Sequence, residues 1–312
     1  YRGVSCNLSN HKGNQMTLKD LSLVEAKQFT SHYPALIVGA NNAGKSFSIE
    51  NMPAEDKKRT DIFNYDIKPL GEGTPDEFHN VYTVFADSTS IDKQLDNIVA
   101  IGTKLAAENK NNPILAKLRE QREHLQKMKD NSFFIDDDEA IDKMVNKILE
   151  SAFNPDVDRI VADTLTALTD FCDAWSKAHF SGREVWNAYG TAHQRILQAL
   201  KEANIFCYKY VYILAHHDYI PPAQYAMTPK QVVKVKGGIM SGNVEAHFNT
   251  IVFTHATQEG VRMFECDVNS SLDTSRTKIL DGKFSFNRTS LDDLEQLFAK
   301  KKTVVDGKLV EA

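Results

Sequence analysis

The sequence predicts an α/β protein with a mainly parallel central sheet, antiparallel strands at its C-terminal edge and a helical insertion. Three observations lead to this prediction. Short apolar runs alternate with helical patterns along most of the chain, which is typical of a parallel sheet covered by helices. A long, charged helical stretch interrupts this alternation between residues 88 and 153. Strand-like runs joined by short turns follow near the C-terminus, which favours an antiparallel edge.

The predicted strands and helices follow in order along the chain. Ala35–Gly39 is a short apolar run before a polar loop, which predicts a buried strand. Residues 59–66 and 81–86 predict two more strands, separated by a turn rich in proline and glycine. The later predicted elements are strands at 159–163 and 209–215, helices at 165–178 and 185–203, strands at 246–255, 261–268 and 278–286, and a helix at 291–302.

The composition is that of a globular protein and excludes several other classes. Of the 312 residues, 42% are hydrophobic and 25% are charged, which is enough apolar material for a sizeable core. No apolar run is long enough for a membrane helix, and we expect no signal peptide. The four cysteines form no C-x-x-C pair, which excludes a zinc ribbon and is typical of a reducing cytoplasm. The net charge of −5 excludes a basic nucleic-acid coat, so we expect a cytoplasmic protein whose DNA contacts come from a local patch.

Residues 39–46 read GANNAGKS and match the phosphate-binding pattern G-x-x-x-x-G-K-[ST] at every fixed position. The match lies between a predicted strand and a predicted helix, which is the context that the pattern requires. Glycines let the backbone wrap around a phosphate, so that N–H groups point at the anion. The lysine can reach the β- and γ-phosphate oxygens, and the serine hydroxyl can bind Mg²⁺. The predicted nucleotide-binding residues are Gly39, Asn42, Ala43, Gly44, Lys45 and Ser46.

A phosphate loop that uses magnesium also needs a carboxylate at the end of a neighbouring strand. Asp163 ends the predicted strand 159–163, so Ser46 and Asp163 are the predicted magnesium ligands. Asp66 and Asp87 also follow predicted strands, and either could orient or deprotonate the attacking water, or instead cap a turn or helix. No guanine-specifying N-K-x-D motif is present, which favours ATP as the nucleotide.

Several segments follow the order and spacing of a known family. After the phosphate loop come RTDIFNYDIKPL at 59–70, IVADTLTAL at 160–168, ILAHH at 213–217 and KVKGG at 234–238. This order resembles the RecA-like phage ATPases grouped as phage nucleotide-binding proteins, which include single-strand-annealing recombination proteins. The resemblance covers residues 33 to about 290. It implies a RecA-like core, ATP hydrolysis with Mg²⁺, and self-assembly into a ring or filament on single-stranded DNA.

The resemblance also implies roles for individual residues. Lys45 and Asp163 would act in hydrolysis, and Asp66 would stand where RecA-like proteins usually have a glutamate that activates water. His216 would be the polar sensor at the end of the central strand, next to a DNA-binding loop. The similar proteins supply cationic fingers to the neighbouring subunit's nucleotide from a late strand, where this chain has Arg276 and Lys278.

The segment from Tyr219 to Lys236, shortly after His216, contains aromatic rings and lysines but no acidic residue. Aromatic rings can stack on bases and lysines can neutralise phosphates, which would suit a protein that binds single-stranded DNA of any sequence. An ordinary flexible loop with solvated lysines would have the same composition, so both interpretations stay open. The residues predicted to contact nucleic acid are Tyr219, Tyr225, Lys230, Lys234 and Lys236.

The expected organisation is an N-terminal extension over residues 1–32, an ATPase domain over 33–290, and a C-terminal helix and tail over 291–312. The helical segment at about 88–153 is longer than a minimal core needs, which indicates an insertion that meets a partner. The resemblance implies a function in phage DNA recombination or replication. Two alternatives remain, namely an ATP-gated assembly protein that does not bind DNA and a helicase-type motor of the same fold.

Overall fold

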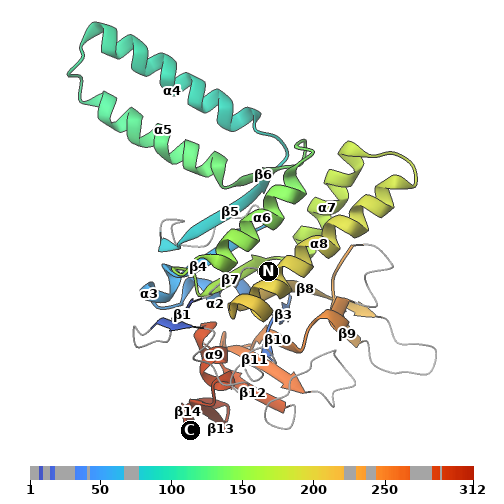
Figure 1. Cartoon of the computed structure of the whole chain (residues 1–312). Helices are drawn as coiled ribbons and strands as arrows, with labels where there is room; N and C mark the ends of the chain where they lie inside the picture. The colour runs from blue at the N-terminus through green and yellow to red at the C-terminus, as the bar shows by residue number, and fades with distance from the viewer. Residues whose placement is uncertain are drawn as a thin grey trace.

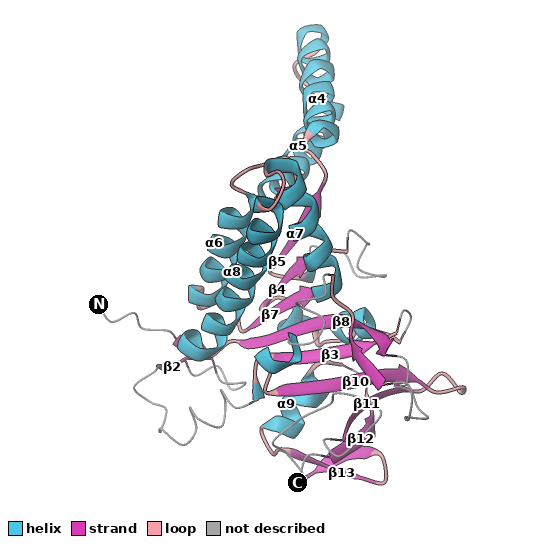
Figure 2. Cartoon of the chain, turned by 90° about the vertical axis from the view of Figure 1, so that its right-hand side faces the viewer, coloured by secondary structure: helices cyan, strands magenta, loops and turns pink. Residues whose placement is uncertain are grey.

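The structure is a computed structural model that describes residues 7–9, 15–17, 32–40, 43–66, 77–220, 230–236, 244–267, 283–288 and 290–312 (Figure 1). Its centre is a ten-stranded sheet in the order β12-β11-β10-β3-β8-β7-β4-β5-β6, with β9 paired to the outer part of β8 (Figure 2). The strands of this sheet are β3 (Ala35–Gly39), β4 (Thr60–Asn64), β5 (Asn80–Phe85), β6 (Ser132–Phe134), β7 (Arg159–Asp163), β8 (Tyr210–Ile220), β9 (Lys230–Val233), β10 (Thr250–Ala256), β11 (Arg262–Asp267) and β12 (Lys283–Asn287). Two small separate hairpins pair β1 (Asn7–Ser9) with β2 (Gln15–Thr17) and β13 (Lys302–Val305) with β14 (Lys308–Glu311).

The middle of the sheet is parallel and its C-terminal edge is antiparallel. Neighbouring strands from β10 to β6 all pair in parallel, whereas β11 and β12 pair antiparallel. Strand β8 lies between β3 and β7, with Gly39 opposite His216 and Asp163 opposite Leu214. The carboxyl ends of these three strands therefore lie at one edge, where open α/β sheets bind their ligands.

Helices cover both faces of this sheet, so the fold has three layers. Along β3, Leu36 and Val38 pack in the cluster formed with α6, α7 and α8, whereas Ala35 and Ile37 pack with Ile49 of α2 and the apolar side of α9. Alternate residues of a strand point to opposite faces, so a sheet covered on both faces requires a continuous apolar run. The helices are α2 (Lys45–Glu50), α3 (Ala54–Lys57), α4 (Thr89–Glu108), α5 (Ile114–Asp130), α6 (Ala140–Phe153), α7 (Leu165–His179), α8 (Glu184–Cys207), the 3₁₀ helix η2 (Val244–His247) and α9 (Asp292–Phe298).

Helices α4 and α5 form a hairpin that projects from the body of the molecule (Figure 1). Both helices are described over their whole length. Ile91 is the one buried residue of α4, and α5 has no buried residue. At the base of the hairpin the Lys129 ammonium donates to Asp92 Oδ1 at 2.6 Å. The hairpin is therefore an appendage that shares little core with the sheet.

The predicted fold class, an α/β protein with a mainly parallel central sheet, is confirmed in its architecture. The sheet is mainly parallel, its C-terminal strands are antiparallel, and a helical segment follows β5. In the described part of the chain, no helix is long and apolar enough to cross a bilayer. Cys172, Cys207 and Cys266 are buried.

Several segments differ from the prediction. The strand expected from residue 246 begins at Thr250, after η2, and the helix expected to reach residue 302 ends at Phe298. The strand expected to end at residue 215 continues to Ile220, because residues 217–220 pair with β9, where a loop was expected. Within the segment expected to be helical, residues 132–134 form the strand β6, which extends the sheet. The expected tail after α9 forms the hairpin of β13 and β14. Local pattern did not reveal these strands, because strand formation depends on distant pairing partners.

Candidate nucleotide-binding site

The two fixed glycines of the phosphate loop lie where a side chain would not fit. A Cβ atom on Gly39 would lie 2.6 Å from Thr254 Cγ2, because β10 pairs with β3 at this point. Gly44 has a φ of 80°, and a Cβ atom there would lie 2.4 Å from Arg262 Nε. The first glycine therefore permits close approach of the two strands, and the second permits a left-handed turn directly before α2.

Lys45 begins α2, and its side chain turns back into the loop. It is 6% exposed, and its Nζ atom donates to the carbonyl oxygens of Gly39 and Ala40, each at 2.9 Å. Nζ also lies 3.1 Å from Nδ1 of His216 in the neighbouring strand β8. Because an ammonium group can only donate, this ring nitrogen accepts and carries no proton. The structure thus brings the loop lysine and the predicted sensor into contact.

Ser46 and Asp163 also meet at this edge. The Ser46 hydroxyl donates to Asp163 Oδ2 at 3.1 Å, and the carboxylate is buried at the end of β7. Hydroxyl and carboxylate oxygens are ligands that Mg²⁺ accepts in combination with phosphate oxygens and water. Among the described residues, no group of three or more His, Cys, Asp or Glu side chains could hold a metal alone. The pair therefore fits a magnesium ion that a bound nucleotide helps to hold.

A cavity of about 390 Å³ is lined by Ala40 of the loop and by Thr164, the residue after Asp163. Asp66 and His216 also line it. Asp66 follows β4, the strand next to β7, and its N–H donates to Asn64 Oδ1 at 3.2 Å. Asp87 is exposed, and its Oδ1 accepts from the N–H of Thr89 at 2.8 Å, which is a contact at the start of α4. Of the two acids considered for the attacking water, Asp66 is thus the one beside the loop.

Thr166 of α7 connects this cavity to β9. Its hydroxyl accepts from the N–H of His216 at 3.2 Å and donates to the carbonyl of Lys234 at 2.8 Å. The N–H of Lys234 donates in turn to the carbonyl of His216 at 2.8 Å. Beside it, the pKa of His217 is lowered by burial first and by Lys45 second. The strand pair is therefore tied to the cavity by hydrogen bonds on both sides of His216.

The predicted nucleic-acid residues follow the β8–β9 pair. Tyr219 belongs to β8 and Lys230 to β9, and Lys234 is exposed at the cavity. Lys236 differs, because its Nζ atom lies 2.7 Å from Asp173 Oδ2 and 3.4 Å from Asp170 Oδ1 in α7. Its hydrogen bond to Asp173 raises its pKa. Since two carboxylates already neutralise Lys236, Lys234 is the better candidate for a phosphate contact.

Four predicted site residues lie outside the described residues, and their roles stay predictions. They are Asn42 of the loop, Tyr225 of the aromatic segment, and the cationic pair Arg276 and Lys278.

Sequence reasoning missed two arginines that lie against the loop. Arg262 begins β11, and its guanidinium lies 3.6 Å from the ring centre of Phe47 in α2. Arg288 directly follows β12, is 4% exposed, and donates to backbone carbonyls of the loop. Burial, and then the charge of Arg262, lower the pKa of Arg288 to about 10, so it stays protonated at neutral pH. No local pattern marks either residue, because both are far from the loop in sequence.

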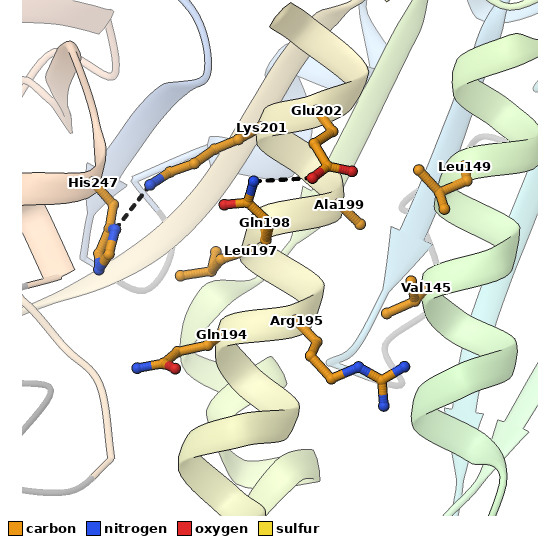
Figure 3. Close-up of a pocket in the computed structure, with 10 residues that line it drawn as sticks. All are labelled: Val145, Leu149, Gln194, Arg195, Leu197, Gln198, Ala199, Lys201, Glu202 and His247. Carbon is orange, nitrogen blue, oxygen red and sulfur yellow. Dashed lines mark hydrogen bonds between the residues drawn. The ribbon is translucent and has the colours of Figure 1, made fainter. Parts of the chain in front are cut away.

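A second cavity, of about 500 Å³, is lined by residues of α6 and α8 (Figure 3). Figure 3 shows Lys201 pointing at His247, with Nζ 2.8 Å from Nδ1. Burial lowers the pKa of both groups, and Lys201 lowers that of His247 further. None of the predicted site residues lines this cavity, and its charged side chains are of both signs. It is therefore separate from the candidate site.

No protein-family model and no curated protein sequence matches the chain. Among solved structures, the crystal structure of the RadB recombinase is similar, with a TM-score of 0.39 and 14% sequence identity. The match covers 81% of this chain and 84% of that chain. The similarity is distant, so the function of this chain has to be inferred from its own loop and carboxylates.

Proposed function

We propose that the chain is a RecA-like, Mg²⁺-dependent ATPase whose site is the phosphate loop at the carboxyl end of β3. One observation supports this most strongly. Two polar pairs lie side by side at the carboxyl ends of the parallel strands, Lys45 with His216 and Ser46 with Asp163. A lysine, a hydroxyl and a buried carboxylate in this arrangement are the groups that hold a polyphosphate and its metal. Packing alone does not require a buried ammonium group at this position.

The proposed chemistry is attack of water on the γ-phosphate. Mg²⁺, when bound, neutralises phosphate charge and polarises the γ-phosphoryl group. Lys45 adds positive charge at the phosphate oxygens, and the loop N–H groups orient the chain of phosphates. Asp66, which lines the cavity beside the loop, orients the attacking water and accepts its proton. His216 responds to the nucleotide through its contact with Lys45.

The proposal extends to assembly of several copies on single-stranded DNA, in the cytoplasm and in phage recombination or replication. Lys234 supports the DNA contact, because it is exposed at the cavity and bonded to His216 and Thr166 through its backbone. A change at the nucleotide would therefore reach the β8–β9 pair. Arg276 and Lys278 would complete the site of the neighbouring copy.

An ATP-gated assembly protein that does not bind DNA is the second candidate. The α4–α5 hairpin favours it, because the hairpin projects from the body and exposes Val99, Ile101 and Ile114 (Figure 1). A projecting arm with exposed apolar side chains is a place where another protein could bind. The neutralised Lys236 also leaves fewer free cations for DNA.

ATP turnover with and without single-stranded DNA tests the proposal. We expect hydrolysis that requires Mg²⁺ and rises with DNA, and a DNA affinity that falls as salt increases. Lys234→Ala should weaken DNA binding, whereas Lys236→Ala is the matched control. Hydrolysis without any DNA effect selects the assembly protein, and ATP-driven duplex unwinding selects a helicase-type motor. A folded protein that neither binds nor hydrolyses ATP refutes all three.

A further inference from the structure

The guanidinium of Arg288 contacts the phosphate loop and both of the elements that support it. Its Nη2 atom donates to the carbonyl oxygens of Ala43 and Gly44, at 2.7 and 2.8 Å. Its Nε atom donates to Thr254 Oγ1 of β10 at 2.9 Å, and Nη1 donates to the hydroxyl of Ser48 in α2. One side chain therefore joins the loop, the helix after it and the strand beside it.

The two carbonyl contacts fix the directions of two loop N–H groups. A trans peptide group is planar, and its C=O and N–H bonds point to opposite sides. The carbonyl of Ala43 shares a peptide group with the N–H of Gly44, and the carbonyl of Gly44 shares one with the N–H of Lys45. Because both carbonyls turn toward Arg288, both N–H groups point away from it. The side of the loop away from Arg288 is its inner side, and the phosphate-binding pattern needs these N–H groups there, facing the anion.

Core packing does not account for an arginine at this position. The four hydrogen bonds of Arg288 all go to neutral oxygens, and among the described residues no carboxylate accepts from it. A second cation, Arg262, lies close enough to disfavour its charge, whereas Asp293 and the ring of Phe264, 4.9 Å from the guanidinium, favour it. A buried charge without an opposite partner destabilises a fold unless its hydrogen bonds compensate. Here the compensating bonds are made to the loop and its supports, so the charge is placed where it acts on the loop.

We propose that Arg288 is a positioning residue of the nucleotide site, which keeps the N–H groups of Gly44 and Lys45 aimed at the bound phosphate. The inference rests on the proposed function of the loop. Hydrogen bonds from a charged donor also polarise the two peptide groups, which strengthens their N–H donors. Arg288 thus acts through the backbone, without touching the phosphate itself. The nucleotide affinity of the loop then depends on a residue at the end of β12.

The test compares binding of the non-hydrolysed analogue AMP-PNP with Mg²⁺ to the full chain and its variants by calorimetry. Arg288→Lys keeps the charge but cannot reach all four acceptors, and we expect it to raise Kd about 10- to 100-fold, as is typical when the support of a ligand group is removed. Arg288→Ala should lose more affinity, and guanidinium ion well below its denaturing range should restore part of it, whereas sodium chloride should not. Thr254→Val, which removes one acceptor at similar size, should raise Kd several-fold.

The control is Arg159→Lys, which alters another buried arginine. Arg159 is the first residue of β7, at the end of that strand away from Asp163 and the loop. It should lower the unfolding temperature and leave Kd unchanged. If Arg288→Ala does not fold, the Lys and Val variants still decide. Wild-type affinity in Arg288→Lys together with wild-type affinity in Thr254→Val would overturn the positioning role while the proposed function stands. A wild-type chain that does not bind AMP-PNP would overturn both.

Discussion

Asp66 and Asp87 both follow strands of the sheet, but their carboxylates have different neighbours. Asp66 lines the cavity beside the loop, and Asp87 accepts a backbone hydrogen bond at the start of α4. We expect Asp66→Asn to lower kcat by about 10²-fold or more, the usual contribution of a general base, with little change in nucleotide affinity. Asp87→Asn is the matched control and should hydrolyse ATP at the wild-type rate. An inactive Asp87→Asn beside an active Asp66→Asn would assign water activation to the other strand.

His193 in α8 predicts a pH dependence of stability. Both of its ring nitrogens are buried and lack a hydrogen-bond partner among the described residues. Burial, and to a smaller extent His247, lower its pKa from 6.5 to about 4. The unfolded chain takes up a proton below about pH 6.5 that the folded chain resists until about pH 4, so stability falls as the pH falls through that range.

Urea unfolding of the wild type and of His193→Leu measures this effect. Between about pH 7.5 and about pH 5, the unfolding free energy of the wild type should fall by about 2 kcal/mol more than that of the variant. His124→Leu changes an exposed histidine of α5 and should keep the wild-type profile. Parallel pH profiles for the wild type and His193→Leu would show that the buried imidazole has an ordinary pKa.

Residues of the site could be predicted from the sequence where a local pattern fixes their chemistry. The glycines, Lys45 and Ser46 are prescribed by the loop pattern, and Asp163 follows from its strand end. Arg288 could not be found this way, because it reaches the loop only after the chain has formed β12. The pairing of Lys236 with Asp173 likewise depends on how β9 packs against α7.

Helices α4 and α5 contact mainly each other and have little contact with the rest of the described chain. The ion pair of Lys129 with Asp92 shows that the two helices are adjacent at their base. A short Gly-Ser linker can therefore replace residues 93–128. We expect this deletion to lower the unfolding temperature by about 5 °C or less, because α5 has no fully buried residue. AMP-PNP affinity should not change.

Thermal unfolding by circular dichroism and calorimetric binding check this deletion against the full chain. A deletion variant that does not fold would mean that the hairpin is part of the core. Loss of self-assembly with retained ATP binding would instead support the assembly protein as the function.

Continuous apolar runs made the central strands predictable, because each is buried on both faces and needs no partner to be recognised. Helices α6, α7 and α8 were likewise expected from their periodic apolar faces. The short strands β6 and β9 lack such a run, and each forms because a longer neighbour offers free backbone groups. Elements defined by pairing were therefore missed, whereas elements defined by burial were found.

Across the whole molecule, the two ends of the parallel strands have different roles. The proposed nucleotide site lies at the carboxyl ends of the parallel strands, and a buried charge network around Arg159 lies at their amino ends. This arginine is 1% exposed and donates to both oxygens of Glu295, each at 2.6 Å, and to Asp56 Oδ1 at 2.8 Å. The network joins β7 to α9 and α3. Burial raises the pKa of Glu295 despite the adjacent guanidinium.

Arg159→Ala would leave two buried carboxylates without their cation. We expect the free energy of unfolding to fall by about 3–5 kcal/mol, the range for breaking a buried ion pair on one side. Nucleotide affinity, measured below the unfolding temperature, should not change. A loss of less than about 1 kcal/mol in urea unfolding would show that the network behaves like an exposed ion pair.

The most direct measurement is the rate of Mg²⁺-dependent ATP hydrolysis by the wild type and by Lys45→Ala, at equal folded concentration. The lysine acts on phosphate charge and shares no apolar core, so the variant should keep the circular dichroism spectrum of the wild type. We expect turnover by the wild type that stops when Mg²⁺ is removed, and a loss of about 10²-fold or more in Lys45→Ala. Equal rates in the two proteins, or no hydrolysis by a folded wild type, would contradict the proposed ATPase function.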